Sequence, residues 1–194
     1  MNCPNAASLG HEATATVQEV GEGVTSVKPG DRVVCHWRKG VGLQGPAATY
    51  TSKRFPHLNS GWVTTFSEYS VVSENRLTRI PPDFDAEAGA LFGCAATTAM
   101  GVLNNNAKLG IGESIVILGT GGVGLNLVQF AAMAGAHPII GVDLHDHKLE
   151  LAKKFGATHT INSCGINLVE EVRKIVGAAG ADVAIENTGL ADLI

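Results

Sequence analysis

The most informative segment of this chain reads Ile115-Val-Ile-Leu-Gly-Thr-Gly-Gly-Val-Gly124. Its apolar start predicts a buried strand, and the glycines after it predict a tight turn that opens a helix. In this setting Gly119 permits the turn, Gly121 lets a pyrophosphate approach the backbone, and Gly124 lets helix and strand pack closely. Free amides and the positive end of a helix dipole favour a phosphate there. The segment therefore predicts a dinucleotide site.

Strand and helix signals alternate from Ser114 onward. The expected strands are 114–118, 139–142, 159–161 and 182–186, and the expected helices are 122–134, 146–155 and 168–176. These strands are continuously apolar rather than alternating, which is typical of a parallel sheet covered by helices on both faces. The fold class of this region is therefore α/β, with right-handed crossovers.

A carboxylate closes the second expected strand. Asp143 stands about twenty residues beyond Gly124, near the spacing of a ribose ligand in dinucleotide-binding folds. Its carboxylate would accept from both ribose hydroxyls and repel a 2′-phosphate, which favours NAD over NADP. Lys148 and His145 follow closely and would soften that repulsion. The plain alternatives are a helix N-cap for Asp143 and a solvated helix face for Lys148.

The region before Pro81 carries the signals of β structure instead. Alternating polarity predicts strands at 13–17, 32–36 and 66–73, and Lys28-Pro-Gly-Asp31 predicts a type II turn between two of them. Short strands joined by glycine turns indicate a small barrel-like domain. The segment 39–61 lacks a pattern, so we expect an ordered lobe without assigned secondary structure. Beyond Pro81-Pro82, alanine and leucine predict a helix over 85–103.

The composition excludes several classes of partner. The chain has 194 residues, 45% of them hydrophobic and 16% charged, with a net charge of -4 and no dense basic cluster. We therefore expect neither nucleic acid nor a membrane surface as a partner. Glycines, a proline and a histidine interrupt the most apolar region, 114–142, which excludes a membrane span. The start carries no secretory signal and the four cysteines form no Cys-x-x-Cys pair, so we expect reduced thiols and the cytoplasm.

Several motifs, in this order, resemble those of the medium-chain, zinc-dependent alcohol dehydrogenases. They are Gly10-His-Glu12, Val20-Gly-Glu-Gly-Val24, Lys28-Pro-Gly-Asp-Arg-Val33, Glu68-Tyr69, Leu91-Phe-Gly-Cys94 with Thr97-Thr98, the glycine motif 119–124, and Asp143. The resemblance covers nearly the whole chain. It implies a partial GroES-like β-barrel domain over 1–95, carrying the zinc site. A partial doubly wound Rossmann domain, binding NAD, would follow over 96–194.

The resemblance also implies a metal site. His11 and Cys94 would be ligands of one catalytic zinc, with Glu12 beside the metal as an outer partner or occasional ligand. An imidazole and a thiolate are borderline-soft donors that suit Zn²⁺. Taken without the family, a lone histidine is more often an ordinary surface or core residue, and a lone cysteine a small buried hydrophobe.

The same resemblance extends the cofactor site. Thr98 would help seat the nicotinamide ring, and Val123 would pack near the unreactive face of that ring. The expected catalytic residues are His11, Glu12, Cys94 and Thr98. The expected cofactor-binding residues are Thr98, Gly119, Gly121, Gly122, Val123, Gly124, Asp143 and Lys148.

The function implied is that of an oxidoreductase. It would transfer hydride between NAD and a small-molecule alcohol, including a polyol or sugar, in a full-length form that associates as a homo-oligomer. One alternative is a zinc-free quinone or enone reductase of the same superfamily, against which His11 and Cys94 count. The other is a non-catalytic NAD-binding fragment, because the family's remaining zinc-ligand cysteine and proton relay are not in this sequence.

Three departures from the family pattern carry further expectations. Cys3 stands too close to His11 to match the remaining zinc-ligand cysteine. Many members hold a structural zinc through four closely spaced cysteines in the part equivalent to 35–61, where this chain has only Cys35, so we expect no structural zinc. A doubly wound domain would add two strands beyond 182–186, and without them an apolar edge strand is bare. We therefore expect the sequence to be a piece of a longer chain.

Overall fold

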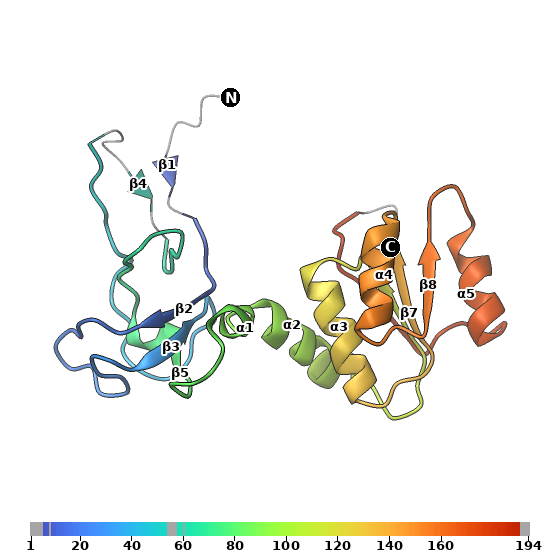
Figure 1. Ribbon diagram of the computed structural model, residues 1–194, viewed down its shortest axis with the longest axis horizontal. Helices are drawn as coiled ribbons and strands as arrows, with labels where there is room; N and C mark the ends of the chain where they lie inside the picture. The colour runs from blue at the N-terminus through green and yellow to red at the C-terminus, as the bar shows by residue number, and fades with distance from the viewer. Residues whose placement is uncertain (1–5, 8, 54–57, 60, 191–194) are drawn as a thin grey trace. The chain divides into compact units, whose positions relative to one another are not determined.

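The computed structural model describes residues 6–7, 9–53, 58–59 and 61–190 (Figure 1). The chain forms two compact units, residues 1–94 and residues 95–194. No helix among the described residues is both long enough and apolar enough to cross a membrane.

The first unit is built on a small antiparallel sheet. Its strands are β2 (Ala13–Thr16), β3 (Arg32–Cys35) and β5 (Leu77–Arg79), in the order β2-β3-β5. The predicted turn before β3 is confirmed, because Gly30 has φ +90° and the Asp31 amide donates to the Lys28 carbonyl over 3.0 Å. A second pairing joins β1 (Ala6–Ala7) and β4 (Leu58–Asn59) in parallel.

The prediction of a strand over 66–73 is wrong. Residues 66–73 form bends and irregular backbone, and the third strand of the sheet lies later, at β5. Side chains satisfy the backbone locally, since the Ser67 hydroxyl donates to the Tyr69 carbonyl over 2.8 Å and the Ser70 hydroxyl donates to the Thr64 carbonyl. The alternation also fails to mark burial, because Phe66 and Tyr69 are both exposed. Serine bonding of this kind competes with sheet pairing.

One short helical turn fastens the lobe of the first unit. This turn is the 3-10 helix η1 (Glu74–Arg76), and all three of its residues are buried. The Glu74 carboxylate accepts from the amides of Thr25, Ser26 and Leu43 over 2.7–2.9 Å. These bonds, led by that from Leu43, lower the pKa of Glu74 to about 2. A single buried carboxylate therefore joins three segments far apart in the sequence.

Arg76 supports the same lobe from the other end of η1. Its guanidinium carbon lies 5.8 Å from the ring centroid of Trp37 and 5.9 Å from that of Trp62, the two tryptophans that flank the lobe. Such contacts are favourable between a cation and an aromatic face. Arg76 thus contacts the tryptophan on each side of the lobe.

The single helix predicted over 85–103 is interrupted. The chain instead forms α1 (Ala86–Leu91), a turn, α2 (Ala95–Gly101) and the π-helix η2 (Val102–Ala107). Asp85 caps α1 by accepting from the Ala88 amide over 2.7 Å. At the other end, the Gly93 amide bonds the Ala90 carbonyl, which tightens the last turn and stops the helix. Alanine and leucine content predicted helix correctly but did not reveal the break.

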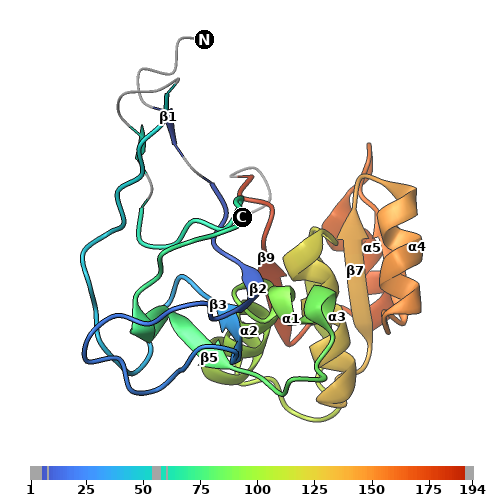
Figure 2. The ribbon, with the colours of Figure 1, turned by 60° about the vertical axis from the view of Figure 1, so that its left-hand side comes forward.

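The second unit is a four-stranded parallel sheet, as predicted. Its strands are β6 (Ile115–Leu118), β7 (Ile139–Asp143), β8 (His159–Asn162) and β9 (Val183–Glu186), the last of which is visible in Figure 2. Their order in the sheet is β8-β7-β6-β9, with every pairing parallel. The helices between them are α3 (Gly122–Met133), α4 (Asp146–Lys154) and α5 (Leu168–Val176).

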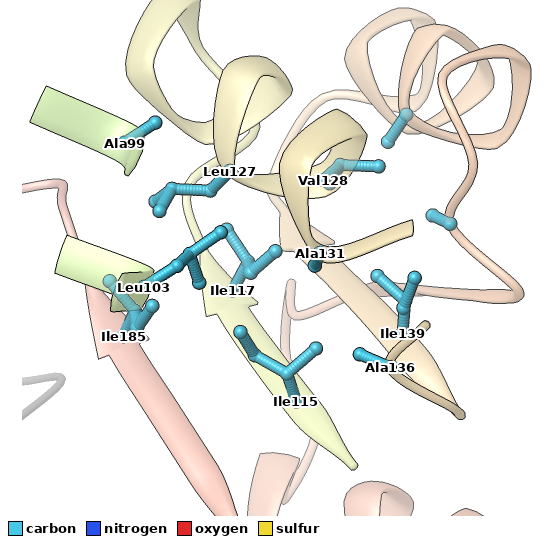
Figure 3. Close-up of a cluster of buried hydrophobic side chains, with 12 residues drawn as sticks. Ala99, Leu103, Ile115, Ile117, Leu127, Val128, Ala131, Ala136, Ile139 and Ile185 are labelled. Carbon is cyan, nitrogen blue, oxygen red and sulfur yellow. The ribbon is translucent and has the colours of Figure 1, made fainter. Parts of the chain in front are cut away.

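Both faces of this sheet are covered. On one face, Ile115 and Ile117 pack with Leu127 and Val128 of α3 in a cluster that also includes residues of α2 and η2 (Figure 3). On the other face, Val116 and its neighbours in β7 and β8 pack against α5. All four residues of β6 are buried. Continuous apolar strands follow from this two-sided burial.

Candidate functional site

The carboxyl ends of β6 and its neighbours form the candidate cofactor site. The chain goes from β6 to β7 on one side, and later returns to place β9 on the other side of β6. Such a reversal of strand order leaves a crevice beyond the strand ends, and nucleotides bind there in open α/β sheets. The glycine motif and Asp143 both lie at this end of the sheet.

The glycine turn has the backbone that its sequence predicts. Gly119 has φ +91°, and its amide donates to the Val142 carbonyl over 2.8 Å. A Cβ on Gly124 would lie 1.9 Å from the Gly119 carbonyl oxygen, so only glycine lets α3 approach the turn this closely. By contrast, a Cβ on Gly121 or Gly122 would meet nothing within 4 Å. These two residues border open space at the start of α3, where a phosphate group can be accommodated.

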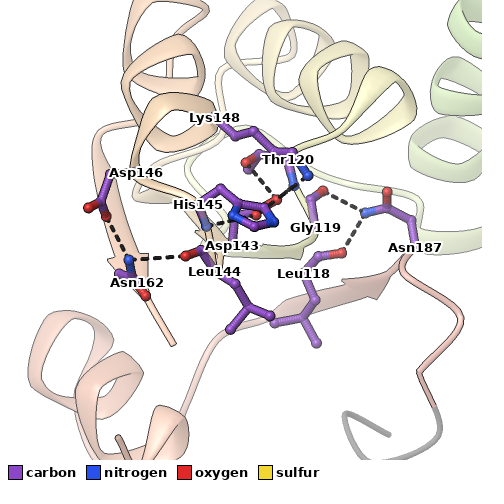
Figure 4. Close-up of polar contacts among 10 residues, drawn as sticks. All are labelled: Leu118, Gly119, Thr120, Asp143, Leu144, His145, Asp146, Lys148, Asn162 and Asn187. Atoms are coloured by element: carbon purple, nitrogen blue, oxygen red, sulfur yellow. Dashed lines mark hydrogen bonds and ion pairs between the residues drawn. The ribbon is translucent and has the colours of Figure 1, made fainter. Parts of the chain in front are cut away.

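Asp143 is buried at the end of β7, with 9% of its surface exposed. Its Oδ2 accepts from the amide of Thr120 over 2.9 Å and from the Thr120 hydroxyl over 3.2 Å (Figure 4). Its Oδ1 accepts from the His145 amide over 3.1 Å and lies 3.7 Å from the Lys148 ammonium. Asp143 is not the N-cap of α4, because His145 occupies that position.

The charge of Asp143 follows from these contacts. Burial taken alone raises the pKa of the carboxyl. The Thr120 and His145 amides, the Lys148 ammonium and the Thr120 hydroxyl oppose it, and the net result is a lowered pKa. Asp143 is therefore an anion at neutral pH. A buried anion at this place favours hydroxyl donors over phosphate groups.

Two residues of the crevice were not predicted. Thr120 is fully buried between the glycines of the motif, and its partner Asp143 is 23 residues away in the sequence. Asn187 directly follows β9, and its amide Nδ2 donates to the carbonyls of Leu118 and Gly119 over 2.6 and 3.0 Å (Figure 4). Asn187 thus fastens the end of β9 to the glycine turn. Its only sequence signal is that it is the first amide after the fourth strand.

The remaining predicted cofactor residues occupy different surroundings. Lys148 lies on α4 with 36% of its side chain exposed, and its ammonium lies 3.7 Å from Asp143, so its role toward a cofactor stays a prediction. Val123 is partly buried and packs against the core cluster under α3. Thr98 lies in α2 of the second unit and is exposed.

The predicted metal ligands all belong to the first unit. His11 is exposed and Glu12 is half-buried, directly before β2, while Cys94 is half-buried after α1. A Cβ on Gly93 would lie 3.3 Å from the Glu12 Cα, so the two backbone segments that carry the predicted ligands adjoin. No group of three or more histidine, cysteine, aspartate or glutamate residues gathers as a metal cage within the described ranges.

Two family models match consecutive parts of the chain. Residues 1–82 match the alcohol dehydrogenase GroES-like domain, and residues 122–194 match the zinc-binding dehydrogenase family. The S-(hydroxymethyl)glutathione dehydrogenase of Photobacterium damsela subsp. piscicida is 40% identical, over 79% of this chain and 48% of the relative. The chain thus spans about half the length of this relative.

Solved structures show the same fold. Benzyl alcohol dehydrogenase from Acinetobacter calcoaceticus superposes with a TM-score of 0.83 at 29% identity, over 96% of this chain and 57% of that one. The quinone oxidoreductase of Escherichia coli, complexed with NADPH, gives a TM-score of 0.77 at 26% identity, over 95% and 50% of the two chains. From its two domain matches, its curated relatives and these neighbours, the chain belongs to the medium-chain, zinc-dependent alcohol dehydrogenase family.

Proposed function

We propose that the complete protein transfers hydride between a small-molecule alcohol and NAD. The observation that carries this proposal is the buried Asp143 carboxylate beside an open glycine turn at the carboxyl end of a parallel sheet. We assign the zinc-site domain to residues 1–95 and the NAD-binding domain to residues 96–194. Family membership and the names of the relatives support the reaction class.

In this proposal each end of the cofactor has its own residues. The pyrophosphate lies against the amides at Gly121 and Gly122, where no side chain fills the space. The adenosine ribose hydrogen-bonds to Asp143 and Lys148, whose opposite charges lie 3.7 Å apart. An anion at Asp143 repels a 2′-phosphate, so NAD is the preferred cofactor. Thr98 and Val123 serve the nicotinamide end.

A catalytic zinc fits the chemistry of the donors available. An imidazole at His11 and a thiolate at Cys94 would hold it, with Glu12 beside it, and the adjoining of Gly93 and Glu12 supports a shared site. Bound zinc supplies Lewis-acid polarisation of an alcohol or carbonyl oxygen. The role proposed for the first unit is then to hold that metal.

The substrate class follows from the relatives. One is named for S-(hydroxymethyl)glutathione and another for benzyl alcohol, and both of these compounds carry a –CH2OH group. We therefore propose a primary alcohol as the substrate.

The decisive experiment measures metal content and turnover together. Purified full-length protein is expected to hold one catalytic zinc and to reduce NAD with a primary alcohol. His11→Ala and Cys94→Ser should each lower zinc content and alcohol turnover while leaving NAD affinity within about twofold. Cys164→Ser is the matched control, because Cys164 is an exposed thiol in the second unit. Unchanged zinc and turnover in Cys94→Ser would contradict the metal assignment.

A zinc-free quinone or enone reductase is the second candidate. The likeness to the quinone oxidoreductase complexed with NADPH favours it. Purified protein without zinc that oxidises reduced cofactor with a quinone, and shows no alcohol turnover, would establish this alternative.

A further inference from the structure

We propose that Thr120 is a positioning residue for the adenosine ribose, and that it sets the preference for NAD by holding one oxygen of Asp143. This inference rests on the proposed function and deepens it. In this proposal Thr120 does not contact the cofactor. It acts through Asp143, because its hydrogen bonds occupy one carboxylate oxygen and leave the other available to a ligand.

The first step concerns the fixed oxygen. Oδ2 of Asp143 accepts two hydrogen bonds from Thr120, one from its amide at 2.9 Å and one from its hydroxyl at 3.2 Å. A carboxylate oxygen has about two lone-pair directions. Oδ2 is therefore filled by the protein itself. Because Thr120 is fully buried, water does not compete for these bonds.

The second step concerns what holds Thr120. A Cβ on Gly141 would lie 3.2 Å from the methyl carbon of Thr120, so the absence of a side chain in the middle of β7 makes room for that methyl group. The methyl thus packs against β7 while the hydroxyl reaches Asp143 at the end of the same strand. A side chain held on both sides keeps one rotamer, and so does the carboxylate that it bonds.

The third step concerns the available oxygen. Oδ1 of Asp143 accepts from the His145 amide at 3.1 Å, and its other neighbour is the Lys148 ammonium at 3.7 Å (Figure 4). That distance exceeds a normal hydrogen bond, and Lys148 is partly exposed, so the ammonium is the contact that a ligand can share or replace. Asp143 therefore has one acceptor direction for a ribose hydroxyl, rather than the two expected from its sequence position.

The specificity follows from this arrangement. With Oδ2 fixed, the carboxylate cannot rotate away from a 2′-phosphate, so its negative charge stays directed at the ribose. A free carboxylate would turn and let Lys148 pair with the phosphate instead. The Thr120 hydroxyl holds the carboxylate in this orientation together with the amides of Thr120 and His145, and it is the one of these three contacts that a side-chain substitution removes.

The test uses ligands that do not require turnover. Isothermal titration calorimetry on the full chain would measure the Kd values of ADP-ribose and of its 2′-phosphate counterpart. Thr120→Val keeps the shape and the amide bond but removes the hydroxyl. The ratio of the two Kd values should change by about fivefold in favour of the phosphorylated ligand. Thr120→Ser returns the hydroxyl but not the methyl group that packs on β7, so the ratio should move back toward the wild-type value.

A matched control separates positioning from stability. Thr158 bonds the start of β7 through its hydroxyl, which accepts from the Ile139 amide at 2.9 Å and donates to the Ile139 carbonyl at 3.0 Å. Thr158→Val removes a comparable bond at the opposite end of the same strand. It should lower the melting temperature without changing the ratio. If Thr120→Val does not fold, Thr120→Ala removes the same hydroxyl without placing a methyl group against the Asp143 carboxylate.

The outcomes distinguish this inference from the proposed function. A ratio that stays within twofold of the wild type in a folded Thr120 variant, with ADP-ribose still bound by the wild type, overturns the role of Thr120 and leaves the dehydrogenase proposal intact. Failure of the wild type to bind ADP-ribose overturns the proposed function, and this inference with it.

Discussion

Gly124 of α3 contacts the carbonyl of Gly119 so closely that a Cβ at position 124 would lie 1.9 Å from the oxygen. Gly124→Ala must therefore move α3 away from the turn that follows β6. We expect a loss of about 1–3 kcal/mol or more in the free energy of unfolding, as for other overpacked positions. Urea denaturation followed by circular dichroism measures it. A free energy of unfolding equal to that of the wild type would show that α3 can shift away from the turn without loss of stability.

Gly121 offers the opposite case in the same motif. It has φ −78°, and a Cβ there would meet no protein atom within 4 Å. Gly121→Ala should leave the protein folded, with stability unchanged or raised by about 0.4–1 kcal/mol. The methyl group would instead occupy the approach of the pyrophosphate, so we expect NAD to bind at least about tenfold more weakly. Calorimetric titration with NAD checks this, and unchanged affinity would place the pyrophosphate elsewhere.

Glu74 predicts a pH dependence of stability. The amides of Leu43, Ser26 and Thr25 lower its pKa from 4.5 to about 2 in the folded protein. The group therefore stabilises the fold above about pH 4.5, and this contribution is lost as the pH falls toward 2. Glu74→Gln should melt at a lower temperature than the wild type at pH 7.

The gap between the two proteins should narrow on acidification. Glutamine has no charge to lose, so scanning calorimetry between pH 7 and pH 3 should show the two melting temperatures converging. Equal melting temperatures at pH 7 would argue against the three amide bonds as anchors of the lobe. Glu150→Gln is a suitable control, because the Glu150 carboxylate is exposed and pairs only with Lys153 among the contacts described.

Cys35 should be chemically inert. Burial raises its pKa to about 11, above the ordinary 9.0, so the reactive thiolate is scarce at pH 8.5. Iodoacetamide at that pH should label the exposed Cys164 well before Cys35. Peptide mapping by mass spectrometry follows both sites, and added denaturant should make Cys35 reactive. Equal labelling rates in the folded protein would contradict the burial of β3.

Much of the fold was predictable because its signals are local. Four apolar residues in a row, Ile115–Leu118, predicted a strand buried on both faces, and β6 is buried at every position. The turn over Lys28–Asp31 was predictable for the same reason, since proline and glycine restrict the backbone wherever they occur. The segment 66–73 was not, because its alternation reflected no burial and serine hydroxyls satisfied its backbone.

The residues of the candidate site also divide into those that the local sequence predicted and those that it did not. Gly119, Gly121 and Asp143 were predicted from spacing within one strand-turn-helix-strand unit. Asn187 was not, because it reaches the Leu118 carbonyl across 69 positions of sequence, and no local pattern encodes such a contact. The roles of His11, Glu12 and Cys94 stay predictions, supported so far by the adjoining backbones of Gly93 and Glu12.

By itself, the order of residues determined the parallel sheet and the placement of a glycine-rich turn at the carboxyl end of β6. Both features were predictable because glycine turns and buried apolar strands are specified by residues that are adjacent in the sequence. Tertiary structure alone decided that Thr120 saturates one oxygen of Asp143 and leaves the other beside Lys148. A hydrogen bond forms only where donor and acceptor are placed to within tenths of an ångström. Residues far apart in the sequence reach such positions only after the strands have paired.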